Sequence, residues 1–123
     1  MKKKEAITKL NSRKDAPLLT NANTRFANIN TRKEVWWLDI PVRCLKANSG
    51  NALNLVLYNH RTDELHHLSV PSTFFFKNLK GLVVRKDKDV ITLELAVEAA
   101  HQLQDVRSKG AGISFKQFLQ EEY

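Results

Sequence analysis

The stretch ALNLVLYNHRTDELHHLSV, residues 52–70, decides the fold class, because two runs typical of β-strands flank a polar segment. The runs ALNLVLYNH and LHHLSV are joined by RTDE, which predicts a β-hairpin. Aligning them around that turn places Leu57 opposite Leu68 and Leu55 opposite Val70. One face of the hairpin is then apolar, and a slip of one residue would destroy this pattern.

Three of the four histidines lie in the same stretch, which raises the question of a metal site. The expected register places His66 on the apolar face and makes His60 and His67 diagonal neighbours on the other. Diagonal neighbours lie roughly 7–8 Å apart at Cα, within reach of a bridging ion. Zinc requires a third and usually a fourth ligand, which the pattern does not supply. We therefore expect no metal or other cofactor, and a hydrolase or nuclease using the hairpin histidines is the minority alternative.

The segment EVWWLDIPV, residues 34–42, alternates in the same way and predicts another strand that Pro41 ends or places at an edge. Trp36 and Trp37 are adjacent, so they point to opposite faces of this strand. We expect one of them in the core. The other, Trp37, would lie under a helix or be exposed, and an exposed indole ring can stack on a nucleic-acid base or anchor a protein partner.

The rest of the chain predicts two or three short helices and a second hairpin. PSTFFFKNLKG predicts a helix near 72–80, with proline in its first turn and glycine at its end. LVVR and VITLELA, at 82–85 and 90–96, predict strands joined through KDKD. Apolar residues at three-residue steps predict a helix over 97–107, and a capping box beginning at Ser114 predicts a final helix.

These elements predict an α+β fold: a small, mainly antiparallel sheet of about five strands, formed by two hairpins and the strand near 34–42. Two or three short helices would cover one face of the sheet. We expect a single domain over residues 34–123. It would be preceded by an arm, residues 1–33, that is basic and flexible or loosely docked, with a marginal helix near its start.

The arm is inferred chiefly from charge. The chain carries a formal net charge of +7, and residues 1–33 hold nine basic and two acidic side chains, so the excess lies in this segment. Such an asymmetry is typical of a basic arm on a neutral domain. The candidate nucleic-acid-binding residues are Lys2, Lys3, Lys4, Lys9, Arg13, Lys14, Arg25, Arg32, Lys33 and Trp37.

The sequence favours a binding module over an enzyme. It contains no phosphate-binding glycine loop and no serine in a nucleophile elbow, so we name no catalytic residue. We expect a partner that is DNA or RNA. The alternative is a protein-interaction or accessory domain that binds a protein partner or dimerises through a sheet edge.

Location in the cell is inferred from what the sequence lacks. The single cysteine, Cys44, cannot form an internal disulfide, which is typical of a reducing compartment. No apolar run approaches the roughly 20 residues needed to span a bilayer, and the N-terminal lysines are not followed by an apolar signal. We therefore expect a cytoplasmic protein that does not act at a membrane.

Overall fold

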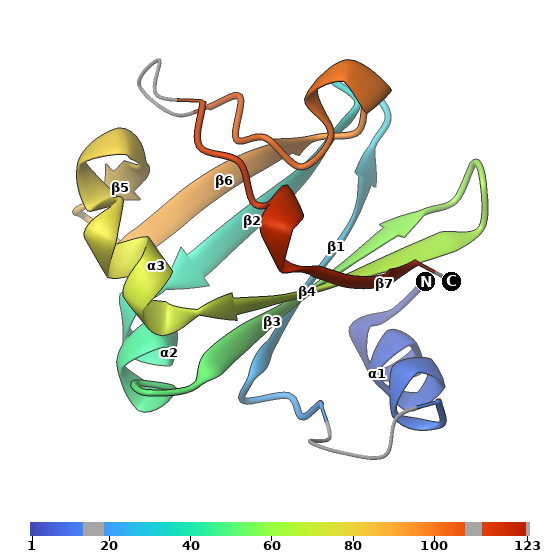
Figure 1. Cartoon of the computed structure of the whole chain (residues 1–123), viewed down its shortest axis with the longest axis horizontal. Coiled ribbons are helices and arrows are strands. Elements are labelled where there is room, and N and C mark those ends of the chain that lie inside the picture. Colours follow the sequence, from blue (N-terminus) through green and yellow to red (C-terminus); the bar gives the residue numbers. More distant parts are fainter. Residues whose placement is uncertain (14–18, 108–111, 123) are drawn as a thin grey trace.

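The computed structural model of the chain describes residues 1–13, 19–107 and 112–122 (Figure 1). The strands are β1 (Thr24–Asn30), β2 (Val35–Pro41), β3 (Ala52–Asn59), β4 (Glu64–Pro71), β5 (Val83–Arg85), β6 (Val90–Ala96) and β7 (Leu119–Glu122). The α-helices are α1 (Lys3–Asn11), α2 (Val42–Ala47) and α3 (Ser72–Lys77). Three short 3₁₀ helices are η1 (Leu79–Gly81), η2 (Ala99–His101) and η3 (Lys116–Phe118).

The strands form one sheet in the order β5-β6-β2-β1-β3-β4-β7. Strands β1 and β3 pair in parallel, and every other neighbouring pair in this described sheet is antiparallel. The α+β class is confirmed, as are the strand at β2 and the two hairpins. The expected count of about five strands is wrong, because β1 and β7 extend the sheet and β1 makes it mixed.

Strand β1 corrects the expected division between an arm and a domain. It lies in the middle of the sheet, paired with β3 over Thr24–Asn28 and with β2 at Ile29 and Asn30. Residues 24–30 therefore belong to the sheet, and residue 33 does not mark the end of a separate arm. The sequence did not predict this strand, because Asn28 and Asn30 on its outward face weaken the apolar alternation that identifies strands.

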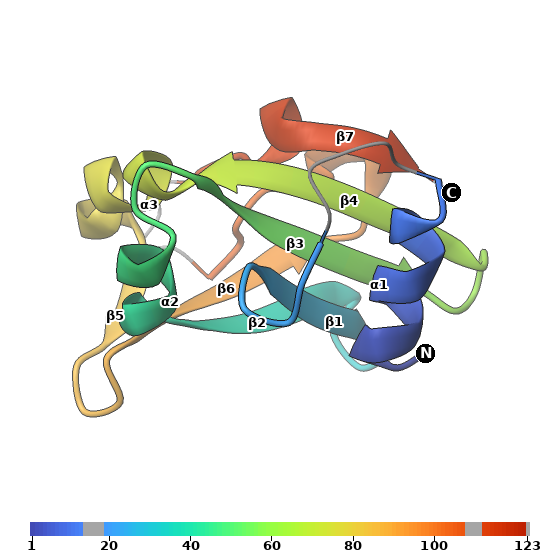
Figure 2. The same cartoon turned by 90° about the horizontal axis from the view of Figure 1, so that it is seen from below.

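Helix α1 packs on the sheet and is not loosely attached. Its buried residues Ala6 and Leu10 join Val56 and Leu65 in a small apolar cluster, together with Leu19. A nine-residue helix is marginal alone in water, so this contact with the sheet stabilises it. Figure 2 shows α1 along one side of the sheet near β1 and β3, with α2 and α3 toward the opposite end.

The main core lies on the opposite face of the sheet. Trp36, Leu55 and Leu68 are fully or almost fully buried there, against Leu103 and Phe115 from the C-terminal part of the chain. That part crosses the sheet in Figure 1. The predicted apolar face of the hairpin is therefore confirmed as a core face.

The hairpin register differs from the expected one by two residues. Leu55 lies opposite Leu68, and Asn59 opposite Glu64, so the turn contains residues 60–63 and not 61–64. Asp63 adopts a left-handed conformation, with φ 55°, that closes this four-residue turn. Because side chains alternate between the two faces of a strand, a shift of two residues leaves each side chain on the same face. The residues predicted for each face are therefore correct, although the predicted pairing was wrong.

The C-terminal helices predicted from apolar spacing are wrong. In place of a helix over 97–107 the chain forms only η2, after which Leu103 has φ 63° and cannot continue a helix. The chain then runs beside β6, where Leu95 forms a bridge with Asp105. The expected final helix is η3 followed by β7. Helix α3 confirms the helix predicted near 72–80, although it ends at Lys77.

Candidate nucleic-acid interface

The sheet face that carries α1 is only partly covered by that helix. Phe26 of β1 lies opposite Val56 under α1, and Asn28 and Asn30 follow Phe26 on the same face. Asn30 lies opposite Val35 of β2, so Trp37 belongs to this face as well. Trp37 is 40% exposed, whereas its neighbour Trp36 is buried in the main core. Of the two places expected for Trp37, under a helix or exposed, the structure has the exposed one.

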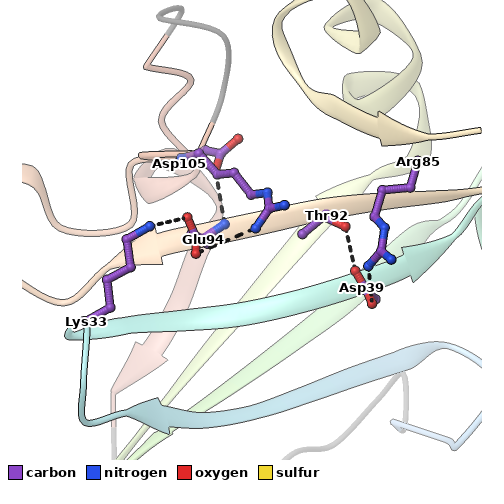
Figure 3. Close-up of polar contacts among 7 residues, drawn as sticks. Lys33, Asp39, Arg85, Thr92, Glu94 and Asp105 are labelled. Atoms are coloured by element: carbon purple, nitrogen blue, oxygen red, sulfur yellow. Dashed lines mark hydrogen bonds and ion pairs between the residues drawn. The ribbon is translucent and has the colours of Figure 1, made fainter.

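Two carboxylates lie on this face on either side of Trp37, one on β2 and one on β6. Asp39 accepts a 2.6 Å hydrogen bond from the Thr92 hydroxyl, and its other carboxylate oxygen lies 3.8 Å from Arg85 (Figure 3). Thr92 lies directly opposite Asp39 across the β2–β6 pair, which positions the hydroxyl for this contact. The cation of Arg85 therefore lies over a carboxylate that is already fixed by a hydrogen bond.

Glu94 lies directly opposite Trp37 and has two basic partners. Lys33 Nζ lies 2.9 Å from one carboxylate oxygen of Glu94, and an Arg107 nitrogen lies 3.8 Å from the other. The Glu94 side chain is only 8% exposed, whereas those of Lys33 and Arg107 are 59% and 39% exposed. The carboxylate thus lies beneath two outward cations, and the surface presented to a ligand here is basic.

Asp105 supports this arrangement from the edge of β6. It is fully buried, and one carboxylate oxygen accepts hydrogen bonds from the backbone N–H groups of Glu94 at 3.0 Å and Arg107 at 3.1 Å. Burial raises the pKa of Asp105, and the two backbone N–H donors partly offset that effect. The side chain holds the Glu94 and Arg107 backbones in register.

The lysines at the start of the chain differ from the cations around Glu94, because none of them has an acidic partner among the residues that the structure describes. Among the described residues, Lys2, Lys3, Lys4 and Lys9 make no ion pair, while Lys33, Arg61, Arg85 and Arg107 each contact a carboxylate. Glu5 is the only acidic residue in the segment 1–13. Four lysines without an ion pair among the described residues therefore lie within eight positions of the chain, on this helix and the residue before it.

Lys3 and Arg25 each bond a backbone carbonyl, although Arg25 is aligned with Leu55 and so projects from the other face of β1 than the one that carries α1. Lys3 Nζ donates to the Asn21 carbonyl at 3.1 Å, and an Arg25 guanidinium nitrogen donates to the Asp39 carbonyl at 3.1 Å. Partial burial lowers the pKa of Lys3, and the positive charge of Arg25 lowers it further. Two cations that repel one another are thus held by neutral carbonyl oxygens, an arrangement that an anion would stabilise.

A hollow of about 240 Å³ lies between α1 and the β3–β4 turn. Lys9 and Arg13 line it together with Tyr58 and Asp63. The Tyr58 hydroxyl donates to the Asp63 carboxylate at 2.7 Å, and this hydrogen bond raises the pKa of Tyr58. Because the Asp63 carboxylate lines this hollow, the hollow is less suited to an anion than the surface around Lys2, Lys3 and Lys4 at the start of the helix.

The structure brings most of the predicted binding residues to one side of the sheet, though not in one cluster. Arg32 and Lys33 are exposed in the turn between β1 and β2, while Arg13 is exposed just beyond α1. Lys14 lies outside the described residues. Sequence reasoning missed Arg85 and Arg107, because they belong to the electrically neutral part of the chain and only the fold places them beside Asp39 and Glu94.

The histidines do not form the expected diagonal pair. His67 lies opposite Val56 and contacts the Asn54 side-chain oxygen at 2.8 Å, whereas His60 is exposed in the turn. His66 is buried edge-on against Trp36, with ring centroids 5.1 Å apart. Across the described segments 1–13, 19–107 and 112–122, no three His, Cys, Asp or Glu side chains are grouped so that they could hold a metal ion.

No protein-family model, curated protein or solved structure matches the chain. In the described part of the chain no helix has the length and apolar character needed to span a membrane.

Proposed function

We propose that this protein is a non-catalytic nucleic-acid-binding module whose lysine-rich helix α1 contacts the phosphate backbone. The observation that carries the proposal is the absence of acidic partners for Lys2, Lys3, Lys4 and Lys9 among the described residues. Lysines that are not neutralised within the protein can each displace a counterion from a phosphate, which is the main source of sequence-independent affinity.

The packing of α1 adds to this argument. Because Ala6 and Leu10 fix the helix on the sheet, its lysines are presented on a folded surface and not on a flexible tail. Less conformational entropy is then lost on binding than for a disordered arm. The like charges of Lys3 and Arg25 favour the same kind of ligand, since an anion beside them would remove a repulsion that exists without it.

The test compares the wild type with two triple variants by fluorescence anisotropy on labelled DNA and RNA at several salt concentrations. The first variant is K2Q/K4Q/K9Q. The second, K46Q/K77Q/K88Q, removes the same charge from exposed lysines of α2, α3 and the β5–β6 turn. We expect salt-dependent binding by the wild type and the control. In the α1 variant the salt slope should fall by about 0.9 per lost contact on duplex DNA, or about 0.7 on single strands.

Two outcomes would overturn the proposal. One is no binding by the wild type at low salt, which would favour a protein partner. The other is an equal loss of affinity in both triple variants, which would show that net charge alone, and not the position of α1, determines binding.

A further inference from the structure

From the face beside α1 we infer that the ligand is single-stranded: Trp37 is a stacking platform for one unpaired base, and the cations around it contact the flanking phosphates. This inference rests on the proposed function, because it names the form of nucleic acid that the same surface would bind. It adds a second contact, made by stacking and not by charge.

The indole ring of Trp37 lies close enough to α1 for one ligand to contact both. Trp37 lies on the same sheet face as α1, separated from the helix by β1, and Asn28 and Asn30 are exposed there. Asn28 Nδ2 donates to the Met1 carbonyl at 3.1 Å, so the beginning of the chain is attached to the strand next to Trp37. A strand of nucleic acid could therefore contact Trp37 and the lysines near the start of α1 together.

The charges around Trp37 are complementary to a nucleic-acid strand. Trp37 is flanked by Asp39 and Glu94, which would repel phosphates if they were uncompensated. Glu94 is covered by Lys33 and Arg107, and Asp39 is bound by Thr92 and approached by Arg85. The carboxylates orient the cations outward, and the surroundings of the ring become favourable to an anionic strand.

The kind of contact that Trp37 permits favours a single strand over a duplex. An exposed Trp on an open sheet face offers a flat ring to any base, because every base has a π face. In a duplex the bases are stacked inside and present only their edges in the grooves. Stacking on Trp37 therefore requires an unpaired base, which distinguishes this contact from the phosphate contacts of α1.

The experiment measures anisotropy of labelled dT20, U20 and a 20-base-pair duplex with full-length wild type, W37A, W37F and F76A. Phe76 is the matched control, since it is 38% exposed on α3 and lies outside the proposed surface. We expect W37A to bind dT20 and U20 about five- to 150-fold more weakly, the range that loss of one stacked base implies. W37F should retain most of the affinity. Duplex affinity should change less than twofold in every variant.

The outcomes separate base stacking on Trp37 from the proposed binding of nucleic acid by α1. If W37A binds single strands as tightly as F76A does, while K2Q/K4Q/K9Q still loses affinity, stacking on Trp37 is overturned and the phosphate contacts of α1 stand. If W37A weakens duplex and single strands equally, selectivity for single strands is overturned. If the wild type binds none of the three probes, the proposed function fails together with the inference. Preference of the wild type for dT20 or U20 would distinguish DNA from RNA.

Discussion

Lys33 Nζ and Glu94 Oε2 lie 2.9 Å apart, although 61 residues separate them in the sequence. The contact joins the β1–β2 turn to β6. Its two partners differ in burial, because the lysine is largely exposed and the carboxylate is almost buried. The two partners should therefore contribute differently to the stability of the fold.

Substitution of Glu94 by alanine should destabilise the protein by about 1–3 kcal/mol, because it leaves Lys33 and Arg107 without their carboxylate. Substitution of Lys33 by alanine should cost less than about 1 kcal/mol, since exposed ion pairs contribute little. Urea denaturation of both variants measures the difference. Equal losses would mean that the burial of Glu94 has no energetic consequence.

Asp105 should make stability depend on pH in a specific direction. Its pKa is raised by burial, so between the ordinary carboxyl value of about 3.9 and the raised value the folded protein binds more protons than the unfolded chain. The Asp105 contribution to the unfolding free energy is therefore most favourable at low pH and declines as pH rises through the raised pKa.

Urea titrations of wild type and D105N from about pH 4 to pH 7 test this dependence. Asparagine keeps an oxygen that can accept the N–H groups of Glu94 and Arg107 but has no charge to lose. The wild type should lose stability relative to D105N as pH rises. A constant difference between the two proteins across that range would show that Asp105 titrates alike in the folded and unfolded states.

The parts of the fold that the sequence predicted are those with local alternation of apolar residues. In β2, Trp36 and Leu38 alternate with exposed or half-buried Trp37 and Asp39, and the structure repeats that pattern. The parallel pairing of β1 with β3 was not predictable in this way. It joins segments separated by α2, and no hairpin turn connects them.

The candidate site was predictable only in part. Clustered lysines near the start of the chain indicated a basic surface, but their lack of acidic partners depends on where the fold places the carboxylates. The helix predicted over 97–107 was wrong for a different reason. Its three-residue apolar spacing is typical of a helix, but Leu103 has a left-handed backbone conformation that turns the chain back along β6.

Substitution of Lys3 should affect binding far more than stability. Substitution by methionine removes a partly buried charge that Arg25 repels, so the unfolding free energy should change by no more than about 0.5 kcal/mol. Nucleic-acid affinity should fall, and the salt slope should decrease by about 0.7–0.9. Denaturation and anisotropy on the same variant separate the two effects. A parallel loss of both would indicate a structural role for Lys3.

The helices α2 and α3 end in the same way, at Asn48 and Asn78, so substitutions of these two asparagines can be compared directly. Pro41 and Asn48 recur as Pro71 and Asn78 in IPVRCLKAN and VPSTFFFKN. Asn48 Nδ2 donates to the Cys44 carbonyl at 2.7 Å, and Asn78 Nδ2 donates to the Phe74 carbonyl at 2.8 Å. The Asn48 amide also lies 3.3 Å from the Ala22 carbonyl.

Alanine at Asn78 should cost about 1 kcal/mol, the typical contribution of one such hydrogen bond. Alanine at Asn48 should cost more, because it also loses the contact that joins α2 to the segment before β1. Thermal or urea denaturation of the two single variants ranks them. The reverse order would mean that the Ala22 contact contributes nothing.

The last prediction concerns the four-residue turns of the three hairpins, each of which ends in an acidic residue with positive φ. The values are 50° at Glu34, 55° at Asp63 and 52° at Asp89. Glycine adopts this conformation without steric cost. Asp89 makes no side-chain hydrogen bond or ion pair within the described residues, and its carbonyl contact with the Val42 N–H does not need a side chain.

D89G should therefore stabilise the protein by about 0.5–1 kcal/mol through relief of backbone strain. D63G should gain less or lose stability, because it removes the hydrogen bond from the Tyr58 hydroxyl. In D63G the pKa of Tyr58 should also return toward its ordinary value, which an ultraviolet titration of the phenol would detect. If D89G is less stable than the wild type, the entropy that glycine adds to the unfolded chain exceeds the strain at this turn.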